Sequence, residues 1–100
     1  PVQVKILPIA DAHIEYANIV KEALLKEGIR AQIDEREEKI GYKIREAQLA
    51  KIPYMLILGD KEKESNTVGV RSRKEGDIGA QKIEEFISNI NAEIKKYGKE

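Results

Sequence analysis

The chain has 100 residues, 41% of them apolar, which is enough for one hydrophobic core and predicts a single domain over residues 1–100. Eighteen basic and eighteen acidic residues give a formal net charge of zero, which argues against a protein that coats nucleic acid through bulk electrostatics, so any RNA contact must be local. The lack of cysteine excludes disulfides and thiolate metal sites, and no apolar run reaches the roughly 18 residues that cross a bilayer, so we expect a cytoplasmic protein with no membrane partner.

The first third of the chain alternates strand and helix patterns. Residues 2–9 mix β-branched apolar residues with polar ones and predict a strand. Residues 11–28 place apolar residues at helical spacing, with Asp11 as the expected N-cap and Gly28 as the stop. Residues 29–35 alternate apolar and polar side chains, which is typical of a half-buried strand at the edge of a sheet.

The middle of the chain repeats that order. A charged loop over residues 35–39 leads into a helix over residues 41–51, which Pro53 ends because the residue before a proline avoids the α region. Five apolar residues over 54–58, followed by Gly59, predict a central strand that is covered on both faces. Right-handed crossovers would make these three strands parallel.

The last third predicts one more strand and a long helix. Residues 67–73 alternate in polarity and follow the previous strand too closely for a crossover, so we expect them to pair antiparallel with it. Residues 75–77 are a predicted turn. From Ile83 onward, apolar residues at helical spacing predict a one-faced helix that ends near Gly98.

No residue pattern in the sequence points to catalysis. The serines lie in no Gly-x-Ser-x-Gly motif, the glycines form no phosphate-binding run, and the carboxylates are interleaved with basic residues. The single histidine, His13, is expected to be a partly exposed helix residue rather than a ligand. A binding module therefore fits the sequence better than an enzyme with a small-molecule site at the strand ends.

Basic residues gather where the predicted strands end. In an open α/β sheet, ligands bind outside the carboxyl ends of the strands, and these ends carry Arg36, Lys39 and Lys43 on one side and residues 60–64 on the other. At the start of the second helix, Lys39, Lys43 and Arg45 could hold RNA phosphates, helped by the positive end of the helix. The alternative is an ordinary solvated helix face.

Two further side chains suit the recognition of unstacked bases. Arg71 could present its planar fork to a purine edge, and Glu62 could accept hydrogen bonds from a base. Alternatively, Arg71 and Arg73 could protect an exposed strand edge. Tyr42 and Tyr54 could stack on bases, although packing in the core is the more ordinary role of such residues.

Three segments resemble one known family. Residues 39–46 read Lys-Ile-Gly-Tyr-Lys-Ile-Arg-Glu, residues 53–55 read Pro-Tyr-Met, and residues 59–62 read Gly-Asp-Lys-Glu. Together they resemble the C-terminal anticodon-binding domain of threonyl-tRNA synthetases, and the resemblance spans nearly the whole chain. It implies a three-layer α/β/α fold with a five-stranded mixed sheet in the order 2-1-3-4-5, strand 4 antiparallel, and a short fifth strand near residues 77–78.

The resemblance implies a tRNA-binding module that recognises the anticodon loop of threonine tRNA during protein synthesis. In the resembling synthetases, the positions that match Arg71 and Glu62 contact the second and third anticodon bases, G and U. Glu37 stands where the family often has an asparagine that helps to read the anticodon, so a base contact is expected there too. The residues expected to bind the RNA backbone are Arg36, Lys39, Lys43 and Arg45.

The same resemblance implies the context of the chain. It would be a C-terminal fragment of a longer threonine–tRNA ligase, non-catalytic by itself, with ATP, threonine and zinc bound only by the missing parts. Its partners would be threonine tRNA and the rest of the synthetase, the fragment being monomeric and the parent a homodimer. The alternative is a stand-alone accessory or protein-interaction subunit that keeps the fold and no longer reads an anticodon, which Glu37 and the zero net charge favour.

Overall fold

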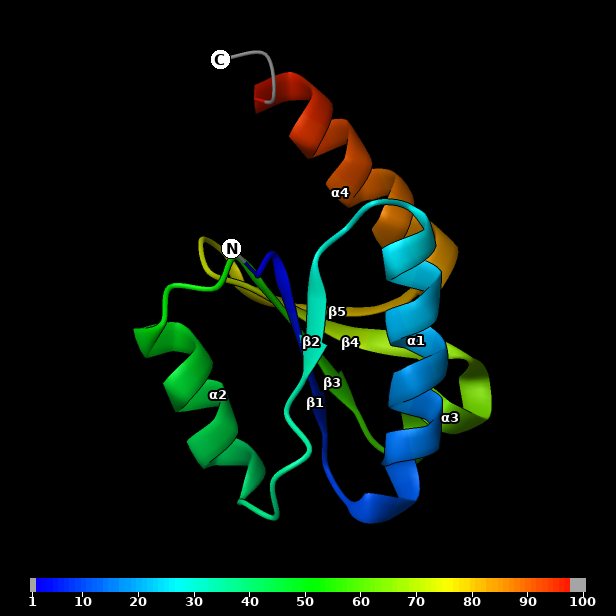
Figure 1. The fold of residues 1–100 in the computed structure, drawn as a ribbon, viewed down its shortest axis with the longest axis vertical. Helices are drawn as coiled ribbons and strands as arrows, with labels where there is room; N and C mark the ends of the chain where they lie inside the picture. Colours follow the sequence, from blue (N-terminus) through cyan, green and yellow to red (C-terminus); the bar gives the residue numbers. More distant parts are fainter. Residues whose placement is uncertain (1, 98–100) are drawn as a thin grey trace.

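Strands and helices follow one another from Val4 to Tyr97 (Figure 1). The structure is a computed structural model, and it describes residues 2–97. In chain order the elements are β1 (Val4–Pro8), the 3₁₀ turn η1 (Asp11–His13), α1 (Ile14–Lys26), β2 (Ala31–Ile33), α2 (Ile40–Leu49), β3 (Tyr54–Leu58), α3 (Asp60–Ser65), β4 (Thr67–Ser72), β5 (Gly76–Lys82) and α4 (Ile83–Tyr97).

The strands form one mixed sheet. β1 pairs in parallel with β2 and with β3, whereas β4 pairs antiparallel with both β3 and β5. The resulting order, β2-β1-β3-β4-β5, confirms the predicted 2-1-3-4-5 sheet with an antiparallel fourth strand. β2 lies at one edge, as its alternating pattern predicted, and β5 forms the other.

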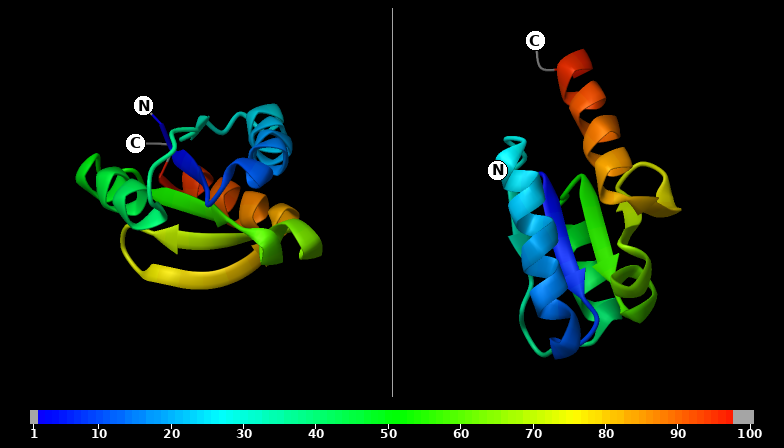
Figure 2. Two further views of the ribbon diagram at one scale, coloured as in Figure 1. Left: turned by 90° about the horizontal axis from the view of Figure 1, so that it is seen from below. Right: turned by 90° about the vertical axis from the view of Figure 1, so that its right-hand side faces the viewer.

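The sheet separates two layers of helices. Figures 1 and 2 show α1 and α4 over one face and α2 over the other, which confirms the predicted three-layer fold. Alternate residues of the central strands face the two helix layers: Ile6 and Leu56 pack toward α1 and α4, and Leu7 and Met55 pack toward α2. The core between the sheet and α1 and α4 is the larger of the two and includes the fully buried Phe86 of α4.

The fifth strand is longer than predicted. It was expected near residues 77–78, but it covers seven residues, and the hairpin turn lies at residues 73–75 rather than 75–77. Its sequence is small and polar with little alternation, so hydrogen bonding to β4, rather than burial of side chains, forms the strand. The pairing carries a bulge opposite Val70 and Arg71, where Gly79 adopts a φ of +89° that a side chain would disfavour.

The start of the first helical segment differs from the prediction. Asp11 is not an N-cap: it opens η1, and the residue before it, Ala10, donates its backbone N–H to His13 Nδ1 at 3.1 Å. The expectation that His13 is partly exposed was also wrong, because the residue is 5% exposed and both ring nitrogens have partners. The helical period could not reveal this, since the contacts come from the turn and from α3.

α3 was predicted neither by the sequence pattern nor by the resemblance. Its six residues, Asp-Lys-Glu-Lys-Glu-Ser, contain no apolar residue and none of them is buried, so no amphipathic period marks the helix. The remaining differences lie at the ends of elements. β2 is shorter than expected, α2 covers residues 40–49 rather than 41–51, and the expected end of α4 at Gly98 lies outside the described residues.

Candidate nucleic-acid interface

A shallow recess opens on the sheet face that carries α2, over β3, β4 and β5. α2 packs on β1 and β3 through Ala47, Leu7 and Met55, whereas most of the β5 side chains are exposed. The recess has a volume of about 240 Å³ and brings together Glu62 from α3 and Arg71 from β4, the two residues that the sequence analysis named as suited to base recognition. The other lining residues are Ile57, Gly69, Val70, Asp77, Gly79 and Ala80.

Arg71 supplies the hydrogen-bond donors of this recess. It lies on β4 opposite Met55 of β3 and Asp77 of β5. Its Nε is buried, and it has no hydrogen-bond partner within residues 2–97. Arg71 as a whole is half-buried and lines the recess, so its guanidinium is placed to donate to an acceptor that enters there. Arg71 lies on the inner strand β4 and Arg73 lies in the turn that follows it, so the alternative that they protect a sheet edge is wrong.

Glu62 supplies the acceptor of the recess. Its Oε1 accepts the backbone N–H of Gly59 at 2.7 Å, which fixes the carboxylate against the start of α3. The Oε2 atom lies over Gly69, since a Cβ built on that glycine would be 3.7 Å from Oε2 and only 3.0 Å from the carbonyl oxygen of Ile57. Gly69 therefore leaves room for the carboxylate above the strand. The sequence analysis placed Gly69 in a strand but gave no signal that a side chain from another element passes over it.

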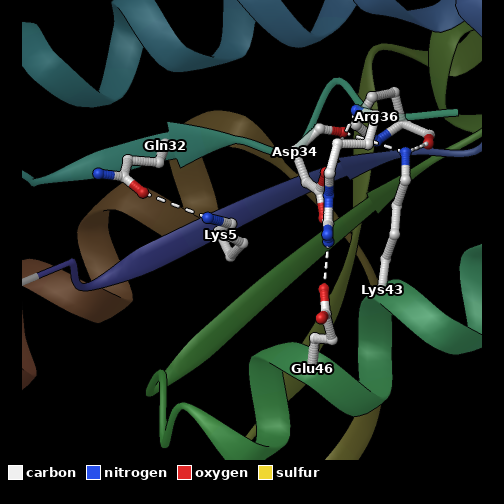
Figure 3. Close-up of polar contacts among 7 residues, drawn as sticks. Lys5, Gln32, Asp34, Arg36, Lys43 and Glu46 are labelled. Atoms are coloured by element: carbon white, nitrogen blue, oxygen red, sulfur yellow. Dashed lines mark hydrogen bonds and ion pairs between the residues drawn. The ribbon is translucent and has the colours of Figure 1, made fainter. Parts of the chain in front are cut away.

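The loop between β2 and α2 is held by an ion-pair cluster, shown in Figure 3. The Arg36 guanidinium donates to both carboxylate oxygens of Asp34, Nε to Oδ1 at 2.9 Å and Nη2 to Oδ2 at 2.8 Å, and Nη2 also pairs with Glu46 of α2. Asp34 is 6% exposed, and its hydrogen bonds to Arg36 hold the pKa of its carboxyl below the usual value. The same guanidinium lowers the pKa of Glu46 and lies 5.9 Å from the centre of the Tyr42 ring.

Lys43 does not occupy the position that its predicted role requires. Its side chain is 3% exposed, and its Nζ donates to the backbone oxygens of Asp34 at 3.0 Å and Pro8 at 3.2 Å (Figure 3). An RNA phosphate could reach this ammonium group only if it replaced those carbonyls. Lys43 therefore joins α2 to the ends of β1 and β2, and the helix spacing that suggested a surface position could not show the loop that covers it.

The other predicted residues of this region are exposed. Glu37, Lys39 and Arg45 have solvent-accessible side chains, and Glu37 also lines a second recess of about 240 Å³ between the ends of β1 and β2. About half of the Arg36 side chain is exposed, so it stays a predicted RNA contact beside its role in the cluster. The structure brings Glu62 and Arg71 to one recess and places Glu37 at the other.

The two tyrosines have different environments. Tyr54 packs edge-to-face on Phe86 with a centroid separation of 5.5 Å, and its hydroxyl donates to Glu93, so it belongs to the core rather than to a base-stacking surface. Tyr42 is 47% exposed and remains available for stacking. Among residues 2–97, no cluster of three or more His, Cys, Asp or Glu side chains could hold a metal ion. None of the helices described in that range is long and apolar enough to cross a membrane.

Comparison with known proteins identifies the family. The model of a family described as the anticodon-binding domain matches residues 3–93. The chain belongs to the anticodon-binding domain family. This membership agrees with the recess, where an arginine and a glutamate lie together on the sheet face.

Curated relatives of this anticodon-binding domain are threonine–tRNA ligases. The chain is 64% identical over 95 residues to the enzyme of Clostridium botulinum strain Loch Maree and 59% identical over 95 residues to that of Clostridioides difficile strain 630. In both comparisons 95% of this chain is matched, and it spans about 15% of the length of the relative. The comparison therefore concerns one domain of those longer enzymes.

Solved structures show the same domain fold. The RNA-binding domain of threonyl-tRNA synthetase from Cryptosporidium parvum Iowa II superimposes with a TM-score of 0.87 and 29% identity, covering 92% of this chain and 23% of that one. Prolyl-tRNA synthetase from the same organism gives 0.85 and 26% identity, covering 97% and 21%. Histidyl-tRNA synthetase from Nostoc gives 0.86 at 16% identity, covering 94% and 23%, and this match shows the fold alone.

Proposed function

We propose that this anticodon-binding domain recognises the anticodon loop of threonine tRNA as the C-terminal part of a threonyl-tRNA synthetase. The observation that carries the proposal is the recess, which brings the Arg71 side chain and the Glu62 carboxylate to one place on the sheet face. A planar fork suits the O6 and N7 acceptors of guanine, and a carboxylate suits the ring N–H of guanine or uracil. The 56–64% identity to threonine–tRNA ligases supports threonine tRNA as the partner.

The groups outside the recess would position the RNA. Lys39 is exposed at the start of α2, where the positive end of the helix also favours phosphate, and Arg45 is exposed in the middle of that helix. Arg36 pairs with Glu46 of the same helix. Lys43 does not belong to this set because its ammonium group donates hydrogen bonds to two backbone carbonyls. Glu37 would offer an acceptor to a base but would repel phosphate, so its contribution to affinity depends on which of the two it meets.

The proposal also concerns the parent enzyme. We expect the domain to have no catalytic activity of its own, and ATP, threonine and zinc to bind the other parts of the synthetase. We further expect the isolated chain to be a monomer, its parent a homodimer, and both to work in the cytoplasm. Sedimentation of the isolated chain tests the first of these expectations about assembly.

The decisive experiment compares two arginines that are two residues apart. We would measure binding of the chain to a threonine-type anticodon stem-loop and to loops with the second or third base changed, at one fixed salt concentration. Arg71→Ala should lose about 1–3 kcal/mol of discrimination at one of these bases. Arg73→Ala, at an exposed position outside the recess, should keep the discrimination of the wild type.

Three outcomes decide between the alternatives. Discrimination that is lost only in Arg71→Ala supports an anticodon reader. Equal weak binding of all loops by the wild type would contradict the proposal and favour an accessory protein that has kept the fold. If Arg71→Ala and Arg73→Ala lose the same affinity for every stem-loop, Arg71 acts through its charge alone.

A further inference from the structure

The buried imidazole of His13 connects two segments that follow neighbouring strands. η1 comes after the carboxyl end of β1, and α3 comes directly after the carboxyl end of β3. His13 Nδ1 accepts the backbone N–H of Ala10 at 3.1 Å, and Nε2 lies 2.7 Å from Asp60 Oδ1 on α3. Because Nδ1 accepts, the proton of the neutral ring is on Nε2 and is donated to Asp60.

Apart from its connections to β3 and β4 and the contact between Glu62 and the Gly59 amide, α3 is held by polar contacts with η1. None of its residues is buried, so hydrophobic packing does not fix its orientation, and a helix of six residues is too short to be stable alone. A second contact from the same side supports the first, since Lys63 Nζ donates to the backbone oxygen of Ala12 at 3.3 Å. η1 therefore holds α3 at two points, of which the His13 contact is the shorter and the more buried.

The orientation of α3 decides where Glu62 points. Glu62 lies two residues after Asp60, and its carboxylate reaches from α3 to the N–H of Gly59 and over Gly69. We propose that His13 is a positioning residue: through Asp60 it holds α3 so that the Glu62 carboxylate faces the recess beside Arg71. This inference rests on the proposed function for its effect on RNA, but its effect on Glu62 is a property of the chain alone.

The exposure of Asp60 makes the idea testable without unfolding the protein. The Asp60 side chain is 89% exposed, so Asp60→Ala removes the acceptor of the His13 proton and leaves no cavity. Asp60→Asn keeps an oxygen that can accept the same proton and should rescue the function. Glu64→Gln is the matched control, because it removes one negative charge from an exposed residue of the same helix.

The first measurement is RNA discrimination by the 100-residue chain. Glu62→Gln identifies the anticodon base that Glu62 contacts, as the base at which discrimination falls. Asp60→Ala should lower discrimination at that same base by about five- to tenfold and leave the discrimination due to Arg71 in place. Asp60→Asn and Glu64→Gln should behave like the wild type. Unchanged discrimination at that base in Asp60→Ala, or an equal loss at both bases, would overturn the positioning role.

The second measurement needs no RNA. Glu62 protects the amide of Gly59, so hydrogen exchange at this amide reports whether the carboxylate is held in place. Exchange should be about tenfold faster in Asp60→Ala and unchanged in Glu64→Gln. If the wild type fails to discriminate between loops, the proposed function is wrong, while the exchange rates still decide whether His13 and Asp60 fix Glu62. Equal exchange in the wild type and in Asp60→Ala would refute the inference.

Discussion

Replacement of Lys43 by methionine separates a structural lysine from a lysine that binds RNA. Methionine keeps the apolar stem in its buried site and removes the ammonium group. The two backbone oxygens of Asp34 and Pro8 then lose their donor, and the buried carboxylate of Asp34 loses a nearby positive charge. The exposed Lys39, four residues earlier, is the matched control, because Lys39→Met removes the same group from solvent.

The size of the expected effect follows from these contacts. A hydrogen bond to a charged group contributes about 1.5–3 kcal/mol, and Lys43 makes two of them. Part of this loss is recovered because methionine is more easily buried than lysine. We therefore expect Lys43→Met to lose about 3 kcal/mol of unfolding free energy. For a domain of this size each kcal/mol lowers Tm by about 4–8 °C, which makes the drop about 12–24 °C. Lys39→Met should change the unfolding free energy by less than about 0.5 kcal/mol.

Urea unfolding and salt-dependent RNA binding check both halves of this prediction. In Lys39→Met, the slope of log affinity against log salt should become shallower by the equivalent of about one phosphate contact. Folded Lys43→Met should keep the slope of the wild type. The opposite pattern would refute the reasoning. If Lys43→Met keeps its full stability and loses a phosphate contact, then Lys43 binds RNA as the sequence alone suggested.

Three further predictions concern the recess, acid stability and the core. Gly69→Val would press on the carbonyl of Ile57 and crowd the Glu62 carboxylate above the strand. It should therefore lose about 1–3 kcal/mol of stability in urea unfolding and also lose discrimination between stem-loops. Wild-type stability and discrimination in this variant would contradict the close approach. Because Arg36 lowers the pKa of Asp34, this pair contributes stability above about pH 4 that is lost as the pH falls through the lowered pKa. The urea midpoint of Asp34→Asn should therefore lie below that of the wild type at about pH 6 and should reach it near about pH 2. A difference between the two midpoints that stays constant over this range would exclude the linkage. Tyr16→Phe removes the 2.7 Å hydrogen bond to the backbone oxygen of Thr67 and should cost about 1 kcal/mol in thermal unfolding, a value that an unchanged Tm would rule out.

Patterns of local polarity predicted much of the fold, and the exceptions have physical causes. The central strand Tyr54–Leu58 was located by its apolar run alone, since burial on both faces demands such residues. α3 and β5 lack that signal because neither buries an apolar face. α3 is stabilised by contacts from Glu62, His13 and Lys63, and β5 by its hydrogen bonds to β4.

The candidate site was predictable in residue type but not in arrangement. Arg71 and Glu62 were chosen for their hydrogen-bonding groups and by resemblance, and the fold places them in one recess. The roles of Gly69 and His13 could not be found in this way. Their significance depends on side chains that are distant in sequence, Glu62 over the glycine and Asp60 against the imidazole.

By itself the sequence determined the order of the first four strands and of helices α1, α2 and α4, the parallel start of the sheet and the presence of charged groups at the strand ends. These features follow from local periodicity and from the handedness of crossovers, which each segment carries independently of its neighbours. Only the tertiary structure decided which charges are free to meet a ligand. Lys39 and Lys43 have identical side chains, yet one is exposed and the other is buried against two carbonyls. Whether a charge is solvated or engaged depends on the segments that pack around it, and those segments come from elsewhere in the chain.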